Sequence, residues 1–156
     1  MADVMLRDRI KAELKDAMKA REERKTATLR LITAALKDRD IAARSKGVND
    51  GIDETEILQM LQTMVKQRHE SIEHYEQAGR LELAEQEREE IEIINFFLPR
   101  QLNETALQKA IDAVIEELGA GSIKDMGRTM SALRERYAGQ IDFGKASAIV
   151  KARLAQ

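Results

Sequence analysis

The sequence contains no cysteine, no tryptophan and a single proline, and aromatic residues make up only 3% of its 156 residues. The lack of thiols excludes a disulfide-stabilised secreted scaffold, a cysteine-ligated zinc or iron–sulfur site and any enzyme with a cysteine nucleophile. Residues 1–10 carry four charged side chains where a secretory signal needs an apolar core, and no apolar run approaches the ~18 residues of a membrane span. We therefore expect a soluble, cytoplasmic protein that does not enter a membrane.

The residues that are abundant favour helices. Ala, Leu, Glu, Lys and Arg dominate, while one proline and eight glycines leave few helix breakers. Apolar residues recur at three- and four-residue spacing, which is typical of helices that bury one face. The sequence predicts an all-α fold.

Four helices are predicted before the proline. The first runs from Met5 to Met18 and has Met18 on its apolar stripe. The second follows residues 22–26 and directs Ile41 toward the core. Asp53 caps the third, which ends near Gly79, and the fourth begins immediately afterwards and continues to about residue 97. Because the residue before a proline avoids the helical region, Leu98-Pro99 ends this series.

Three more helices are predicted after the proline, each with its own N-cap. The caps are Asn103, Ser122 with Asp125 in a capping box, and Asp142. We therefore expect two helical subdomains: an N-terminal helical domain, residues 1–98, and a C-terminal three-helix bundle, residues 99–156.

Charge is distributed unevenly along the chain. The total of −2 combines +5 over residues 1–46, −9 over residues 47–98 and +2 over residues 99–156. We expect the basic first pair of helices to pack beside the acidic second pair. Residues 119–156 are more basic still, with seven basic and three acidic side chains, which is one footprint of a nucleic-acid-binding surface. With so few aromatics, such binding would use RNA shape and backbone rather than base stacking.

Residues capable of metal or acid–base chemistry do not fall into a recognisable pattern. His69 and His74 are five residues apart and point about 140° apart on a helix, so we expect solvated histidines and no metal site. The glutamates between residues 85 and 92 would need burial to act as acid and base. A solvated face, or pairing with Lys66, Arg68 and Arg80, is the favoured interpretation. We expect no cofactor.

The glycine-rich turn over residues 119–129 is the remaining candidate. It is not a P-loop, because five residues separate Gly121 from Gly127 and Arg128 stands where lysine is required. A C-cap followed by an N-cap explains the glycines. Alternatively, Lys124 and Arg128 on one face of the helix start contact a nucleic-acid phosphate without any catalysis.

Three segments carry a family resemblance. They are Leu29-Arg-Leu-Ile-Thr-Ala-Ala-Leu-Lys37, then Val65-Lys-Gln-Arg-His-Glu-Ser-Ile-Glu-His-Tyr-Glu-Gln-Ala-Gly-Arg80 with its continuation to Leu102, and Ser122-Ile-Lys-Asp-Met-Gly127 with Gly144-Lys145 beyond it. With these segments the chain resembles the free-standing YqeY-like proteins of the GatB/YqeY family over nearly its whole length.

The resemblance implies a fold and a partner. The fold is all-helical and in two parts, and a similar domain forms the tail of the B subunit of tRNA-dependent amidotransferase, where it contacts tRNA without performing chemistry. Carried over to matching positions, this implies four RNA-contacting residues: Lys124, Arg128, Lys145 and Lys151. By association only, it also implies a description as a carbon–nitrogen ligase with glutamine as amide donor, for which the chain shows no nucleotide or amidase site.

Two functional hypotheses follow. The leading one is a non-catalytic accessory protein that binds tRNA through the C-terminal bundle. The alternative is a protein-interaction adaptor that docks a partner through the acidic residues 47–98 or through Phe96 and Phe97. An enzymatic role would require turnover by this chain alone.

Overall fold

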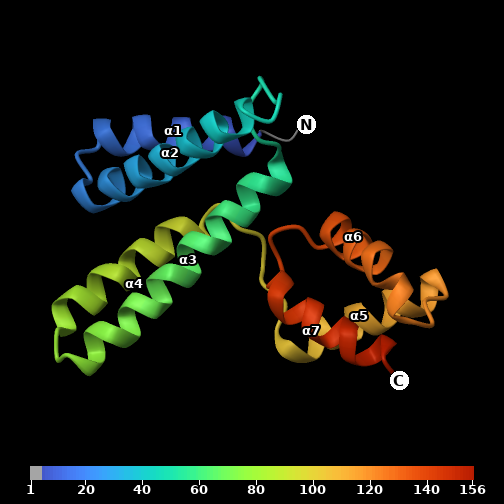
Figure 1. Ribbon diagram of the computed structural model, residues 1–156. Coiled ribbons are helices and arrows are strands. Elements are labelled where there is room, and N and C mark those ends of the chain that lie inside the picture. Colours follow the sequence, from blue (N-terminus) through green and yellow to red (C-terminus); the bar gives the residue numbers. More distant parts are fainter. Residues whose placement is uncertain (1–4) are drawn as a thin grey trace. The chain divides into compact units, whose positions relative to one another are not determined.

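The computed structural model describes residues 5–156, which form seven α-helices, one short 3₁₀ helix and no strand (Figure 1). The predicted all-α fold class is therefore confirmed. The chain divides into two compact units, one ending at Leu98 and the other beginning at Pro99. Each unit has a hydrophobic core of its own.

The first unit contains four helices in two pairs. They are α1 (Leu6–Lys19), α2 (Glu23–Arg44), α3 (Glu54–Gln77) and α4 (Leu81–Asn95). Helix α1 packs along α2, α3 packs along α4, and α2 also contacts α4, as Figure 1 shows. The shared core consists of apolar side chains at helical spacing on every one of the four: Leu6, Ile10, Leu29, Ile32, Ile57, Leu61 and Ile94.

Two side chains predicted to lie in this core do not. Ile41 is 50% exposed and Met18 is 50% exposed. Both errors have the same cause, since a helix turns by about 100° per residue. Ile41 follows the buried Leu36 by five residues, which rotates it about 140° away, and Met18 stands next to the buried Ala17.

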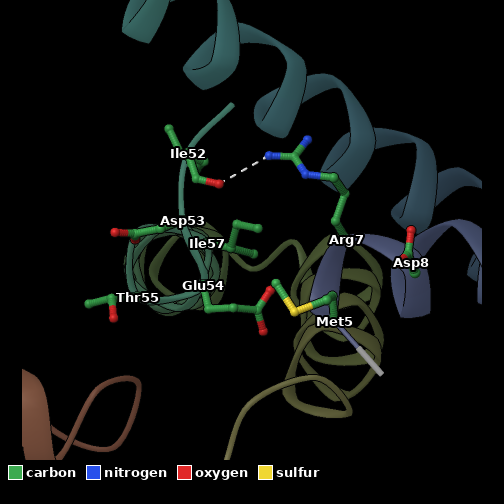
Figure 2. A pocket seen from close by; sticks show the side chains of 8 residues that line it. All are labelled: Met5, Arg7, Asp8, Ile52, Asp53, Glu54, Thr55 and Ile57. Atoms are coloured by element: carbon green, nitrogen blue, oxygen red, sulfur yellow. Dashed lines mark hydrogen bonds between the residues drawn. The ribbon is translucent and has the colours of Figure 1, made fainter. Parts of the chain in front are cut away.

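A cluster around Asp40 joins three segments of the first unit. The guanidinium of Arg7 donates to both carboxylate oxygens of Asp40, at 2.7 and 3.0 Å. It also donates to the carbonyl of Ile52 at 3.2 Å, the contact drawn in Figure 2. The Ile52 N–H donates to Asp40 at 2.9 Å. Position 51 requires glycine, because its φ is +90° and the Cβ of any other residue would lie 2.6 Å from Arg7 Nη2. We call Arg7, Asp40 and the backbone of Ile52 the Asp40 cluster.

A second polar cluster lies between α3 and α4. Arg68 Nε donates to Glu90 Oε2 at 3.0 Å and lies 3.9 Å from Glu87, with all three side chains less than one-fifth exposed. Burial, followed by the charge and hydrogen bonding of Glu90, raises the pKa of Glu87 above its usual value. The cross-helix pairing considered for Arg68 is therefore present. Arg80 instead pairs with its neighbour Glu82.

The second unit consists of α5 (Glu104–Leu118), a 3₁₀ turn, η1 (Ile123–Asp125), α6 (Met126–Arg136) and α7 (Phe143–Leu154). Two of its predicted N-caps are confirmed. The Asn103 side chain accepts from the Ala106 N–H at 2.8 Å, and Asp142 accepts from the Gly144 N–H at 2.8 Å. The predicted capping box of Ser122 and Asp125 is also present, but it opens the 3₁₀ turn, so α6 begins one turn later than predicted. The core of the second unit includes Ile111, Val114, Leu133, Ala146 and Val150.

Candidate nucleic-acid interface

Three arginines of the second unit are held by carboxylates of the same unit. Arg136 pairs with Glu117, Arg153 Nε lies 2.7 Å from Asp112, and Arg128 Nε lies 3.0 Å from Asp125. These arginines keep their positive charge, but a neighbouring negative charge offsets much of it. Arg128, one of the four predicted RNA contacts, therefore contributes less net positive potential than its sequence position indicates.

The other three predicted residues are lysines without such partners. Lys124, Lys145 and Lys151 are all exposed, and no ion pair joins their ammonium groups to a carboxylate among residues 5–156; the contact between Lys145 and Asp142 uses the Lys145 backbone N–H, at 3.3 Å. An exposed ammonium is a mobile point charge that suits a phosphate group. The three lysines are therefore the uncompensated positive charges among the predicted contacts.

The packing of α6 against α7 determines where these lysines lie. The Arg134 guanidinium stands 5.7 Å from the centre of the Phe143 ring, so the end of α6 meets the start of α7, and η1 at the other end of α6 also contacts α7. Because α7 contacts both ends of α6, the two helices run side by side in opposite directions (Figure 1). Lys124, in η1 before α6, is thus at the same end of the pair as Lys151. Lys145 lies in the first turn of α7, about 9 Å away along the axis. The predicted residues form two positions rather than one cluster.

The glycine-rich turn is occupied by a carboxylate of its own. Asp125 accepts from the backbone N–H groups of Gly121, at 2.9 Å, and Ser122, at 3.3 Å. The Gly121 amide first, and then Arg128, hold the pKa of Asp125 below its usual value. Gly119 ends α5 with a φ of 63°. The turn is therefore a C-cap followed by an N-cap, and two of its amides are already used by Asp125.

Arg134 is a further basic residue of this surface, beyond the four that the sequence predicted. Its guanidinium is exposed and is held over the half-buried ring of Phe143. A stacked arginine of this kind keeps all its donors available to an incoming phosphate. The two residues are nine positions apart in the sequence, and their contact depends on how α6 packs against α7. No local sequence pattern predicts that packing.

Other places in the molecule offer less for chemistry. His69 and His74 are both exposed on α3, and no group of three metal-binding side chains occurs among residues 5–156. The pocket drawn in Figure 2 lies between the start of α1 and the start of α3. Its Arg7 belongs to the Asp40 cluster, and its Glu54 accepts from the Leu6 N–H at 3.1 Å. Those groups hold the fold together.

A family model described as "Yqey-like protein" matches residues 7–154. The chain belongs to the YqeY-like family. The resemblance seen in the three sequence segments is thereby confirmed. Among the residues described, no helix of this YqeY-like protein is both long enough and apolar enough to cross a bilayer.

Several fungal proteins are similar to the YqeY-like chain. A Candida glabrata protein named "Altered inheritance of mitochondria protein 41, mitochondrial" is 33% identical over 89 residues, 57% of this chain and 47% of that protein. The Lachancea thermotolerans protein of the same name is 31% identical over 109 residues, 70% of this chain and 55% of that protein. An uncharacterized Schizosaccharomyces pombe protein is 32% identical over 90 residues, 58% of this chain and 69% of that protein. The chain spans about half the length of the first two.

The prediction of a cytoplasmic protein is wrong by this comparison, because six of the relatives carry names that call them mitochondrial. The prediction relied on the absence of an apolar signal core and of a membrane span. Those features separate secreted and membrane proteins from the rest, but they do not distinguish one aqueous intracellular compartment from another.

Proposed function

We propose that this YqeY-like protein is a non-catalytic accessory protein that binds tRNA through its second unit. The observation that carries the proposal is the presence of Lys124, Lys145 and Lys151 as exposed, uncompensated charges on a unit whose arginines are largely paired. Lys145 and Lys151 lie about 9 Å apart along α7 and about 120° apart around it, so they would contact separate phosphates of one RNA backbone rather than a single phosphate. Arg128 and Arg134 lie on the same antiparallel pair and add to the surface.

Glu90 is buried and Glu87 is partly buried, as acid–base groups would be, but Arg68 pairs with both, and this pairing supports a non-catalytic function. The glutamates of α4 that resembled acid–base groups in the sequence act in ion pairs: Glu90 and Glu87 with Arg68, and Glu89 with Arg24 at 3.2 Å. We further propose that residues 1–98 and 99–156 are separate domains, so that RNA binding belongs to the second alone. A carbon–nitrogen ligase activity would need a nucleotide site and an amidase site supplied by other proteins.

Removing the three lysines tests the proposal. The full chain with Lys124→Gln, Lys145→Gln and Lys151→Gln is expected to bind unmodified tRNA about tenfold more weakly at low salt, because phosphate contacts are lost. The slope of log K against log salt should fall by about 0.9 for each contact removed. Fluorescence anisotropy with labelled tRNA across a salt series measures both quantities.

The matched control removes three exposed lysines from α1. Lys11→Gln, Lys15→Gln and Lys19→Gln change the net charge equally but leave the second unit intact. The affinity of this triple variant for tRNA, and the slope of that affinity against salt, should stay at the wild-type values. Equal weakening by both triple variants would show a general charge effect, and the proposed surface would then be wrong.

The adaptor hypothesis retains one of its two aromatic residues. Phe97 is 3% exposed and lies in the core, so it cannot dock a partner, whereas Phe96 is 59% exposed beside it. Arg9 lies 5.8 Å from the centre of the Phe96 ring. If the adaptor role through Phe96 is correct, one stoichiometric protein should co-purify after nuclease treatment and should be lost with Phe96→Ser. Co-purification that disappears with nuclease would favour RNA instead.

A further inference from the structure

Helix α2 has a second apolar face that points away from its core. The face consists of Ala27, Leu31, Ala34 and Ile41, all exposed, with Leu31 at 47% and Ile41 at 50%. At about 100° per residue, these four fall within a sector of about 80°, on the opposite side from the buried Leu29, Ile32 and Leu36. We call these four residues the outer stripe of α2.

A row of basic residues runs along one edge of the outer stripe. Arg30, Lys37 and Arg44 repeat every seven residues, so they follow one side of the helix at intervals of about 10 Å. All three are exposed, and no ion pair or hydrogen bond joins their side chains to another of residues 5–156. The charge of Arg44 also acts on Asp40, one turn earlier on the same helix, without forming an ion pair with it. The acidic second pair of helices compensates Arg24 through Glu89, but it does not reach this row.

The combination of an apolar stripe and a seven-residue row of charges is the pattern by which one helix recognises another. We propose that the outer stripe of α2 binds an amphipathic helix of a partner protein whose flank is acidic. The partner's apolar side chains pack on Leu31 and Ile41, and its carboxylates face Arg30, Lys37 and Arg44. This surface is separate from the lysines of the second unit, so it does not depend on the proposed RNA binding.

Asp38 refines the kind of helix that fits. It is exposed and lies within the sector of the outer stripe, between Ala34 and Ile41. A single charge inside an apolar stripe commonly determines register between paired helices. The partner helix therefore presents a lysine or another hydrogen-bond donor opposite Asp38, within an otherwise apolar face.

Other occupants fit the stripe less well. A second copy pairing through the same face in the antiparallel direction would bring the basic rows Arg30, Lys37 and Arg44 of both copies together, and like charges there repel. The acidic helices α3 and α4 have Leu81 as their single large exposed apolar residue, so they lack a matching stripe. Two large apolar side chains interrupted by Asp38 are too few to enter a membrane.

A pair of synthetic peptides of about four heptads tests the proposal on the full chain. Both carry leucines at the core positions except for one lysine that faces Asp38, and they differ only in having glutamates or lysines on the flank. The glutamate peptide should bind at least about tenfold more tightly, because only it complements the basic row. Fluorescence anisotropy measures the affinity, and amide shifts in NMR spectra should concentrate in residues 27–44. Equal binding of the two peptides, no binding of the glutamate peptide, or shifts outside α2 would overturn the proposal.

Variants identify the surface. The double variant Leu31→Gln with Ile41→Gln should bind the glutamate peptide about tenfold more weakly. The matched double variant Leu81→Gln with Ile123→Gln, which also replaces large exposed apolar residues, should bind the peptide with unchanged affinity. All four side chains are exposed, so the fold is retained. Equal losses in both pairs would overturn the assignment to α2. If Leu31→Gln with Ile41→Gln abolishes a self-association seen in sedimentation, the stripe binds a second copy of the chain. If the same variant abolishes tRNA binding, the stripe binds RNA. Either result would overturn the proposal.

Discussion

Replacing Arg68 by methionine is expected to lower the free energy of unfolding by about 3 kcal/mol at pH 7. The substitution keeps most of the apolar stem but leaves Glu87 and Glu90 together without a cation, and unpaired buried charges are costly. The value is at the low end of such losses because each of these side chains retains some solvent access. Urea denaturation followed by far-UV circular dichroism measures the change.

The pH dependence of this loss identifies its cause. Glu87 already has a pKa above its usual value, so the folded protein binds a proton there more readily than the unfolded chain and gains stability as the pH falls through that range. Arg68 is a charge that lowers the pKa of Glu87, so removing it raises that pKa further. The deficit of Arg68→Met should therefore shrink as the pH is lowered from 7 toward about 4.

The matched control is Arg88→Met between the same two helices. Arg88 lies 2.8 Å from Glu76 and 3.4 Å from Glu85, but all three side chains are about half exposed or more. Exposed ion pairs contribute about 0 to 1 kcal/mol. Should Arg68→Met cost no more than Arg88→Met, the buried cluster would have no special role in stability.

Replacing Asp40 by alanine is expected to cost about 2 kcal/mol of stability, because it leaves the Arg7 guanidinium and the Ile52 N–H without their acceptor. Asp40→Asn keeps an acceptor of the same shape and should cost less. Asp38→Ala, an exposed residue on the same helix, should change stability by less than about 0.5 kcal/mol. Urea titrations of the three variants give the comparison.

Asp40→Asn also separates charge from hydrogen bonding. The hydrogen bond from Arg7 first, and then that from the Ile52 amide, lower the pKa of Asp40 below 3.8, its usual value. The stability from its charge is therefore complete above that usual value and is lost as the pH falls through the lowered one. The wild-type advantage over Asp40→Asn should be constant near neutrality and should decrease below about pH 4. An advantage that is the same at pH 3 and pH 7 would contradict an electrostatic role.

Local sequence patterns predicted the helices and their caps well. Asp53, Asn103 and Asp142 each accept the backbone hydrogen bond expected of an N-cap. These predictions succeed because a cap and its helix lie within a few residues of each other. The same reasoning misplaced Ile41, because its apolar character does not reveal on which side of the helix the core lies. That apolar side chain belongs instead to the outer stripe of α2.

Contacts between distant segments were beyond sequence reasoning. The Asp40 cluster joins residues 33 and 45 positions apart, and no local pattern pairs an arginine in the first helix with an aspartate in the second. The candidate RNA surface shows both cases. Asp125 stands three residues before Arg128, so their pairing was open to prediction. The division of the lysines between the two ends of α7 depends on how α6 packs, which the spacing of the lysines does not reveal.

The Asp40 cluster bears on how fast the first unit comes apart. Most contacts in a helical protein are local and form early in folding, whereas this cluster brings together the first helix, the end of the second and the segment before the third. Contacts that close such long stretches of chain and are absent from the folding transition state act mainly on the unfolding rate. The Asp40 cluster is therefore positioned to lengthen the lifetime of the folded state rather than to speed its formation.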